Sequence, residues 1–218
     1  MSILLNRDTT LDFGPHTIES LLERKIDPNS IKTVFISHMH LDHFSGLPEL
    51  IWYRAIFNNA TDPLVVVGPR GIEKITRELI RLYHTPEPFE INVEFREERH
   101  ENAKGFTMNH LIRDIGYRIE YPEATIFYSG DTSYCENAVL GAERSDILFH
   151  ECTYLDERRS DAEFWKHSTL SDALRVKSES GSKRFVPVHL TPATEKRVRY
   201  LSRKEESVIF PLKPVTIG

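Results

Sequence analysis

The stretch Ser37-His38-Met39-His40-Leu41-Asp42-His43 directly follows an apolar run at residues 31–36. Its H-x-H-x-D-H pattern places four metal-binding side chains within six positions: His38, His40, Asp42 and His43. Imidazole and carboxylate groups are ligands that suit Zn, Mn or Fe, and one short loop can present several of them. An accidental match to this pattern is expected in about one such chain in a thousand. The stretch therefore indicates a metal site rather than a solvated polar loop.

Two ions fit this stretch better than one. The adjacent side chains of Asp42 and His43 cannot readily point at the ion that the first two histidines face. A pair of divalent ions needs further ligands, including a carboxylate that bridges them. The available candidates at the ends of predicted strands are His110, Asp131 and His189. Strand ends that open into loops are where α/β folds assemble their sites.

Composition narrows the class of protein. The chain has 218 residues, of which 39% are hydrophobic and 28% are charged, and we interpret residues 1–218 as a single globular domain. Acidic residues (33) outnumber basic residues (28), which argues against a long nucleic acid as the default partner. Because the chain has two cysteines, no secretion signal and no membrane-spanning run, we expect a cytoplasmic protein without a membrane partner.

Apolar runs rich in β-branched or aromatic residues alternate with helical patterns, which predicts an α/β layered fold. Strands are predicted at residues 9–13, 31–36, 64–67, 91–95, 105–109, 117–121, 125–129, 147–149, 185–188 and 208–212. Helices are predicted at residues 46–58, 70–84, 169–177 and 195–203. The polar motifs follow several of these strands directly, so we expect them at one edge of the fold.

The order of the motifs along the chain resembles that of a known family. After the H-x-H-x-D-H run come Asn109-His110, Gly130-Asp131-Thr132, Glu151-Cys152-Thr153, His167-Ser168-Thr169 and His189. This order spans most of the chain and is similar to that of the ribonuclease Z-like branch of the metallo-β-lactamase superfamily, including its cyclic-phosphate phosphodiesterases. The resemblance implies an αββα sandwich. The chain begins at what looks like the family's second or third strand, so we expect the first N-terminal strand to be missing or truncated.

The resemblance also implies how two divalent ions would be bound. One ion would be bound by His38, His40 and His110. The other would be bound by Asp42, His43 and His189, with Asp131 as the bridge between the two. We expect Zn²⁺, with Mn²⁺ or Fe²⁺ as alternatives, because the same nitrogen and oxygen ligands accept all three.

The implied reaction is hydrolysis of the P–O bond of a phosphodiester. Two adjacent ions lower the pKa of a shared water to roughly 7, so that a hydroxide nucleophile exists at neutral pH. His167, which is not a ligand in the family's pattern, would donate a proton to the leaving alkoxide as the general acid. Asp42 is expected to serve catalysis as well as metal binding.

Departures from the family's pattern narrow the substrate. The short segment between His110 and Asp131 leaves no room for the long arm with which tRNA-processing members grip tRNA. Cys135 and Cys152 alone cannot form the cysteine-rich zinc cluster of some cyclic phosphodiesterases. We therefore expect a small anionic phosphodiester, such as a cyclic nucleotide, a sugar cyclic phosphate or a short RNA end, rather than tRNA or another long nucleic acid. The sequence does not decide whether the protein forms a homodimer.

A second class of enzyme uses the same dinuclear site to hydrolyse carboxylic esters, thioesters or lactones. Relatives of that class lack the His-Ser-Thr element found here at residues 167–169, so its presence favours a phosphodiesterase. A diiron redox protein is expected to carry Glu at position 40, where this chain has His. A non-catalytic metal-binding or nucleic-acid module would not need the full ligand set.

Other polar residues are interpreted as supporting or surface groups. Asp12 resembles an early Asp of the family and is expected to stabilise a turn or orient a ligand. Glu151 and Thr153 are interpreted as structural. Surface or core histidines are expected at His16, His84, His100 and His150. The basic stretch 196–204 is interpreted as a solvated helix face, with contact to an anionic substrate as the alternative.

Overall fold

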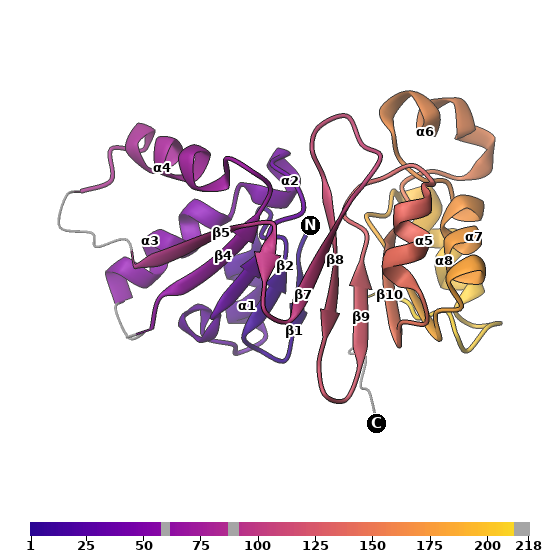
Figure 1. Ribbon diagram of the computed structural model, residues 1–218, viewed down its shortest axis with the longest axis horizontal. Helices are drawn as coiled ribbons and strands as arrows, with labels where there is room; N and C mark the ends of the chain where they lie inside the picture. Colours follow the sequence, from indigo (N-terminus) through magenta and orange to yellow (C-terminus); the bar gives the residue numbers. More distant parts are fainter. Residues whose placement is uncertain (58–61, 87–91, 212–218) are drawn as a thin grey trace. The chain divides into compact units, whose positions relative to one another are not determined.

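The computed structural model describes residues 1–57, 62–86 and 92–211 (Figure 1). The chain divides into two compact units, Met1–His100 and Glu101–Gly218. Each unit contains a β-sheet and helices, and each is described by itself. The single domain expected from the sequence stays a prediction.

The first unit is built on a five-stranded sheet in the order β1-β2-β3-β4-β5. Its strands are β1 (Ile3–Leu5), β2 (Thr9–Leu11), β3 (Thr33–Phe35), β4 (Leu64–Gly68) and β5 (Val93–Glu97). The β1–β2 pair is antiparallel and the other pairs are parallel. Its helices are α1 (Thr17–Glu23), a 3-10 turn (Pro28–Ser30), α2 (Leu41–Phe44), α3 (Leu47–Phe57) and α4 (Ile72–Leu82). A two-residue strand, β6 (Arg99–His100), ends the unit.

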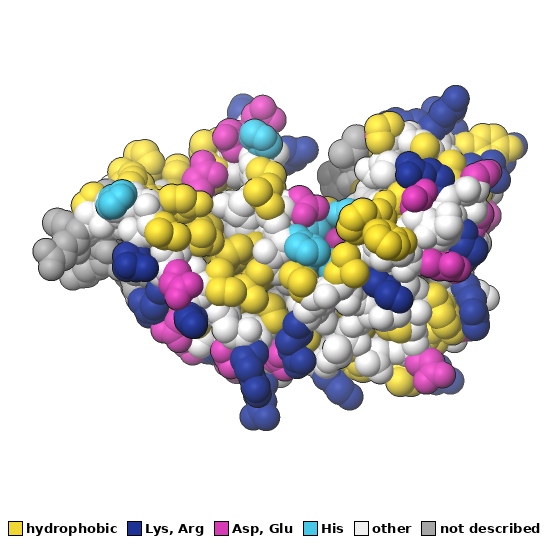
Figure 2. Space-filling view, turned by 90° about the horizontal axis from the view of Figure 1, so that it is seen from above, with side chains coloured by type: hydrophobic (Ala, Val, Ile, Leu, Met, Phe, Trp, Pro, Cys, Tyr) yellow, Lys and Arg dark blue, Asp and Glu magenta, His cyan; other side chains and the backbone are white. Residues whose placement is uncertain are grey.

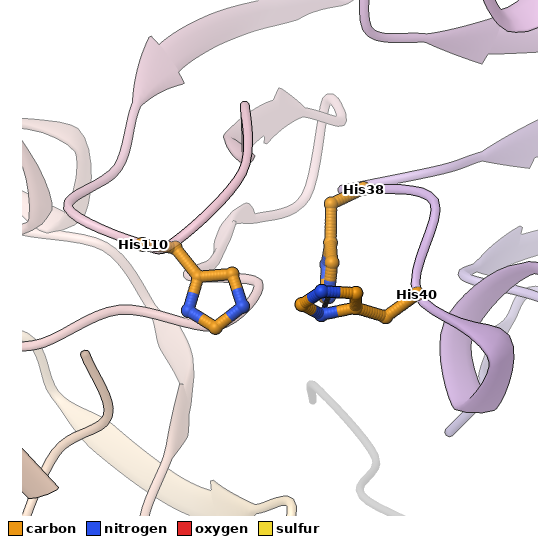
Figure 3. A group of neighbouring side chains, drawn as sticks. All are labelled: His38, His40 and His110. Carbon is orange, nitrogen blue, oxygen red and sulfur yellow. Dashed lines mark hydrogen bonds between the residues drawn. The ribbon is translucent and has the colours of Figure 1, made fainter. Parts of the chain in front are cut away.

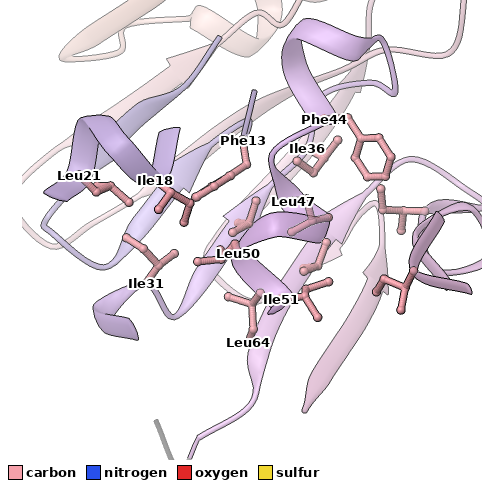
Figure 4. Close-up of a cluster of buried hydrophobic side chains, with 14 of the residues drawn as sticks. Phe13, Ile18, Leu21, Ile31, Ile36, Phe44, Leu47, Leu50, Ile51 and Leu64 are labelled. Atoms are coloured by element: carbon pink, nitrogen blue, oxygen red, sulfur yellow. The ribbon is translucent and has the colours of Figure 1, made fainter. Parts of the chain in front are cut away.

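The core of the first unit forms where the apolar faces of α3 and α4 pack against apolar residues of the strands. In α3, Leu47, Leu50 and Ile51 are spaced three and four residues apart, lie on one face and are buried (Figure 4). In α4, the buried face repeats every four residues at Ile72, Thr76 and Ile80. These faces pack in the same apolar cluster as strand residues such as Val34 and Val66, which explains why helices form in these two stretches.

The second unit is built on the strands β11-β10-β9-β8-β7, which are neighbours in that order. They are β7 (Ala103–Thr107), β8 (Ile115–Glu120), β9 (Thr125–Tyr128), β10 (Ile147–Glu151) and β11 (Arg184–Val188). The pairs β7–β8 and β8–β9 are antiparallel, whereas β10 is parallel to both β9 and β11. The helices are α5 (Glu136–Ala142), a 3-10 turn (Asp156–Arg158), α6 (Arg159–Trp165), α7 (Leu170–Ser180) and α8 (Pro192–Leu201).

Close packing in the second unit brings α5 against the sheet. Gly141 of α5 has no side chain because a Cβ there would lie 2.2 Å from the ring of Phe127 in β9. Helix α7 begins at a capping box, in which Thr169 and Asp172 bond each other's backbone N–H groups. This box fixes the start of α7 directly after His167.

Most of the elements predicted from the sequence are present, and two of the predicted strands differ from the structure for local reasons. The predicted strand 9–13 ends at Leu11 because Asp12 adopts a left-handed backbone, with φ of 56°. The predicted strand 208–212 is reduced to a single bridge between Val208 and Phe185, because the chain enters it from a turn that hydrogen-bonds Val208 to Glu205. Residues 58, 91 and 212, at the ends of three predicted elements, lie outside the described residues.

The elements that the sequence analysis missed are short helices and two short strands, β1 and β6. Helices α1, α5 and α6 have seven residues each, which is too few for a periodic pattern to be recognised. Helix α2 has four residues and includes two members of the metal-binding run, Asp42 and His43. Among the described residues, no helix is long and apolar enough to cross a membrane.

Candidate metal centre

The first unit carries its donor groups in and directly after the loop that follows β3. His38 and His43 are fully buried, His40 is half-buried, and the side chain of Asp42 is 53% exposed. Nε2 of His38 lies 2.9 Å from Nδ1 of His40 (Figure 3), close to the separation of about 3.3 Å between two nitrogens on one tetrahedral ion. Nε2 of His43 lies 3.3 Å from Oδ2 of Asp42. The structure therefore brings the four residues of the H-x-H-x-D-H run together.

Asp12 orients this loop from a buried position after β2. One oxygen of its carboxylate accepts from the backbone N–H of Ser37 at 2.6 Å, and the other accepts from the hydroxyl of Ser37 at 2.8 Å. The same second oxygen accepts from Nδ1 of His43 at 2.7 Å. Nδ1 of His38 lies 3.0 Å from the hydroxyl of Ser37. One carboxylate thus sets the orientation of two histidine rings and leaves their Nε2 atoms as the ligand atoms.

Close backbone approach also shapes this loop. A Cβ on Gly14 would lie 2.0 Å from the carbonyl oxygen of Asp42, and a Cβ on Gly46 would lie 2.3 Å from the carbonyl oxygen of Gly14. Only glycine fits at these two positions. The backbone around Asp42 is therefore held by contacts that no other residue type allows.

The second unit carries its donor groups on four separate segments. His110 follows β7, Asp131 follows β9, His167 follows α6 and His189 follows β11. The ligand atoms of His110, Asp131 and His167 lie within 4.8 Å of one another, as do those of Glu151, His167 and His189. Oδ2 of Asp131 lies 3.6 Å from Nε2 of His189 and 3.9 Å from Nδ1 of His167. The rings of His167 and His189 are stacked, with centroids 5.4 Å apart.

Glu151 connects these segments from the end of β10. Its fully buried carboxylate accepts from Nδ1 of His167 at 2.8 Å, from the backbone N–H of Thr132 at 3.0 Å, and from both the N–H and the hydroxyl of Thr153. The hydroxyl of Thr153 in turn accepts from Nδ1 of His189 at 2.8 Å. Glu151 and Thr153 therefore orient two histidines, in addition to the structural role that the sequence analysis assigned to them. The available sequence signal was an acidic residue directly after an apolar strand.

Two further contacts hold ligand candidates of the second unit. The buried carboxylate of Asp114 accepts from the backbone N–H of Asp131 at 2.9 Å, a role that no motif in the sequence indicates. The backbone carbonyl of Lys166 accepts from Nδ1 of His110 at 3.1 Å. The ring nitrogen of His110 that can act as a metal ligand is therefore Nε2.

The surroundings of His167 raise its pKa above the ordinary histidine value. Burial lowers the pKa, but the hydrogen bond from Nδ1 to Glu151 and the negative charges of Glu151 and Asp131 outweigh that effect. The ring of His167 is thus held by a carboxylate at Nδ1, and its protonated form is more stable than that of an ordinary histidine side chain. This is the arrangement of a histidine that can donate a proton.

The donor set fits divalent ions. Four of the predicted ligand histidines engage Nδ1 with a neighbouring oxygen and so offer Nε2, the arrangement typical of metal-binding histidines. They are His38, His43, His110 and His189. Asp42 and Asp131 add carboxylates, and nitrogen with carboxylate oxygen is a ligand set for Zn, Mn or Fe. Divalent metal binding follows from this chemistry and from the family described next.

The chain belongs to the β-lactamase superfamily. The family model described as beta-lactamase superfamily domain matches residues 8–190. Within the superfamily, the chain is similar to ribonuclease Z of Staphylococcus carnosus, with 27% identity over 83% of this chain and 77% of the relative. It is also similar to ribonuclease Z of Ignicoccus hospitalis, with 28% identity over 92% of this chain and 83% of the relative.

Solved structures show the same fold. Human tRNase Z, short form, aligns with a TM-score of 0.79 and 21% identity, over 100% of this chain and 91% of that one. A diphosphatase from the PhnP family aligns with a TM-score of 0.69 and 18% identity, over 96% of this chain and 79% of that one. The predicted mixed α/β fold with two sheets, the ribonuclease Z-like branch and the metal-dependent hydrolase are confirmed.

Proposed function

We propose that the protein hydrolyses the P–O bond of a small phosphodiester or of an RNA end. The observation that carries this proposal is the pair of Glu151 and His167, with Nδ1 of His167 2.8 Å from Oε1 of Glu151 and 3.9 Å from Oδ2 of Asp131. A histidine held in this way beside a metal-binding carboxylate can act as an acid toward a leaving alkoxide. The ribonuclease Z relatives support a phosphodiester as the substrate.

The proposed ligands come from both donor sets. His38, His40 and His110 would bind one divalent ion. Asp42, His43 and His189 would bind the other, and Asp131 would bridge them. We propose Zn²⁺ because the set is rich in imidazole and contains no thiolate, with Mn²⁺ or Fe²⁺ as alternatives. When bound, the ions would supply a water of lowered pKa and stabilise the charge that develops on the phosphate.

His167 is assigned the proton donor. Because Nδ1 donates to Glu151, the proton that leaves is the one on Nε2, and the carboxylate stabilises the imidazolium before transfer. Thr153 stabilises the same carboxylate through two hydrogen bonds and so keeps Glu151 in place. Asp42 is assigned a second role beside metal binding, because a carboxylate oxygen not engaged with the ion can accept a proton from the attacking water.

The proposed substrate is small because of the segment between His110 and Asp131. Those residues form β8, β9 and their short connections, so this part of the chain is occupied by the sheet itself. A cyclic nucleotide, a sugar cyclic phosphate or a short RNA end has the chemistry that the site requires. Precursor tRNA is the alternative substrate, because the similar proteins are ribonucleases Z. It should be tested beside the small phosphodiesters.

The test combines metal analysis with three substrates: bis-p-nitrophenyl phosphate, p-nitrophenyl acetate and a lactone. We expect the metal-loaded protein to cleave the phosphodiester, H167A to retain both ions but lose turnover by about 10²–10⁴-fold, and D131A to lose metal. His84→Asn is the control, because His84 is exposed and Asn tolerates its left-handed backbone. Preferred cleavage of the ester or the lactone would favour the second enzyme class, and full activity of H167A would remove His167 from the mechanism.

A further inference from the structure

Two aromatic side chains are exposed at the end of α6, directly before His167. Phe164 is 70% exposed and Trp165 is 49% exposed, and their ring centroids lie 4.9 Å apart in an edge-to-face arrangement. Hydrophobic side chains are exposed in several patches on the face drawn in Figure 2. An exposed aromatic pair beside a catalytic group is a feature that points to binding.

The structure fixes the position of this pair relative to the catalytic histidine. Lys166 adopts a left-handed backbone, with φ of 57°, and ends the helix. The backbone N–H of His167 donates to the carbonyl of Ala162 at 2.9 Å, which ties His167 back to α6. Two chain steps of about 3.8 Å separate Trp165 from His167, so their Cα atoms lie within about 7.6 Å of each other.

The surroundings of the pair select a small planar occupant. Six of the eight residues before the pair, 156–163, are charged: Asp156, Glu157, Arg158, Arg159, Asp161 and Glu163. Charged residues are depleted from the centres of protein–protein interfaces. The surface of two aromatic rings is also far smaller than the roughly 800 Å² that each partner buries in a stable interface. A nucleobase needs only a ring face and tolerates polar neighbours.

We propose that Phe164 and Trp165 form a platform on which the nucleobase next to the scissile phosphodiester stacks. This inference rests on the proposed function and adds a substrate class to it: a phosphodiester that carries a base. A nucleobase and its phosphate are joined through one ribose, which matches the short span between the platform and His167. Stacking on an aromatic side chain is tolerant of base identity, so the platform selects nucleotides over sugar phosphates without selecting a sequence.

The first experiment compares base-bearing and abasic ribose phosphodiesters with the same leaving group. We expect F164A and W165A to raise KM for the base-bearing substrate by about 5- to 100-fold with kcat little changed, and to leave the abasic substrate unaffected. Tyr200→Ala is the matched control, because Tyr200 is an aromatic residue of α8 that is 53% exposed. Equal effects of the platform variants on both substrates, or no effect on either, would overturn the proposal.

A binding experiment separates this inference from the proposed function. The chain has two tryptophans, so Trp52→Phe leaves Trp165 as the only one. Titration of this metal-loaded variant with a nucleoside 5′-monophosphate should quench the tryptophan emission, and ribose 5-phosphate should not. Quenching without phosphodiester hydrolysis would contradict only the proposed function, whereas hydrolysis without quenching would contradict only the platform. A third outcome is tryptophan emission that depends on protein concentration, together with self-association in sedimentation that W165A abolishes. That outcome would overturn the platform, because it would show that Phe164 and Trp165 contact a second copy of the chain.

Discussion

The two donor sets of this protein are built in opposite ways. The first unit presents its four donor residues from one run of six, residues 38–43, and a single carboxylate, that of Asp12, orients two of the rings. The second unit draws its donor residues from four segments, which Glu151 and Thr153 tie together. A contiguous set is recognisable in the sequence, whereas a dispersed set exists only once the sheet has formed. The same contrast predicts that a substitution of Glu151 mainly lowers kcat, whereas a substitution of Asp12 mainly lowers metal affinity.

The largest effect is expected for Glu151→Gln in the second set. An amide nitrogen cannot accept the hydrogen bonds that the Glu151 carboxylate receives, so the His167 imidazolium loses its stabilising partner. We expect kcat to fall by about 10²–10⁴-fold while both ions remain bound. Steady-state kinetics with elemental analysis checks this, and Glu163→Gln on exposed α6 is the control. Loss of metal in parallel with activity would show that Glu151 supports the ligands rather than the acid.

A smaller effect, of a different kind, is expected for Asp12→Asn in the first set. The amide has one accepting oxygen, so it cannot accept from the backbone N–H of Ser37 on one side and from the Ser37 hydroxyl and His43 on the other, and the two rings lose their fixed orientation. Metal affinity should fall by about 10- to 100-fold, and kcat at saturating metal should change little. Competition with a chelator measures the affinity, and Asp62→Asn at an exposed position is the control. Unchanged metal affinity would show that the loop holds its shape without Asp12.

The smallest effect is expected in the pH dependence of stability of the metal-free protein. The folded pKa of His167 lies above its unfolded value of about 6.5, so the folded state binds this proton more tightly. The resulting stabilisation is fully present below pH 6.5 and is lost as the pH rises through the folded pKa. Denaturant unfolding of wild type and His167→Gln at several pH values measures it. A His167 contribution that grows as the pH rises above 6.5 would contradict the sign.

The sequence predicted the contiguous donor set better than the dispersed one. The long helices were predicted because apolar residues recur in them at helical spacing, as Ile72 and Ile80 do in α4. Most of the strands were predicted because their residues form short apolar runs. The run 38–43 was predicted from its own pattern. His110, Asp131 and His189 were candidates from their positions at strand ends, and the order of motifs strengthened their assignment as ligands. Their joint role with His38, His40, Asp42 and His43 stays a prediction. The roles of Glu151 and Asp114 were missed because each depends on a loop brought near by the sheet.

Position 166 shows how backbone shape can limit sequence change. The group at Lys166 that holds His110 is the main-chain carbonyl, so the side chain does not supply the contact. What the position requires is the left-handed backbone that turns the chain from α6 into His167. Glycine or asparagine would satisfy this requirement, whereas valine or isoleucine would oppose it. Substitutions that alter charge here are therefore tolerated more readily than those that alter branching at the β-carbon.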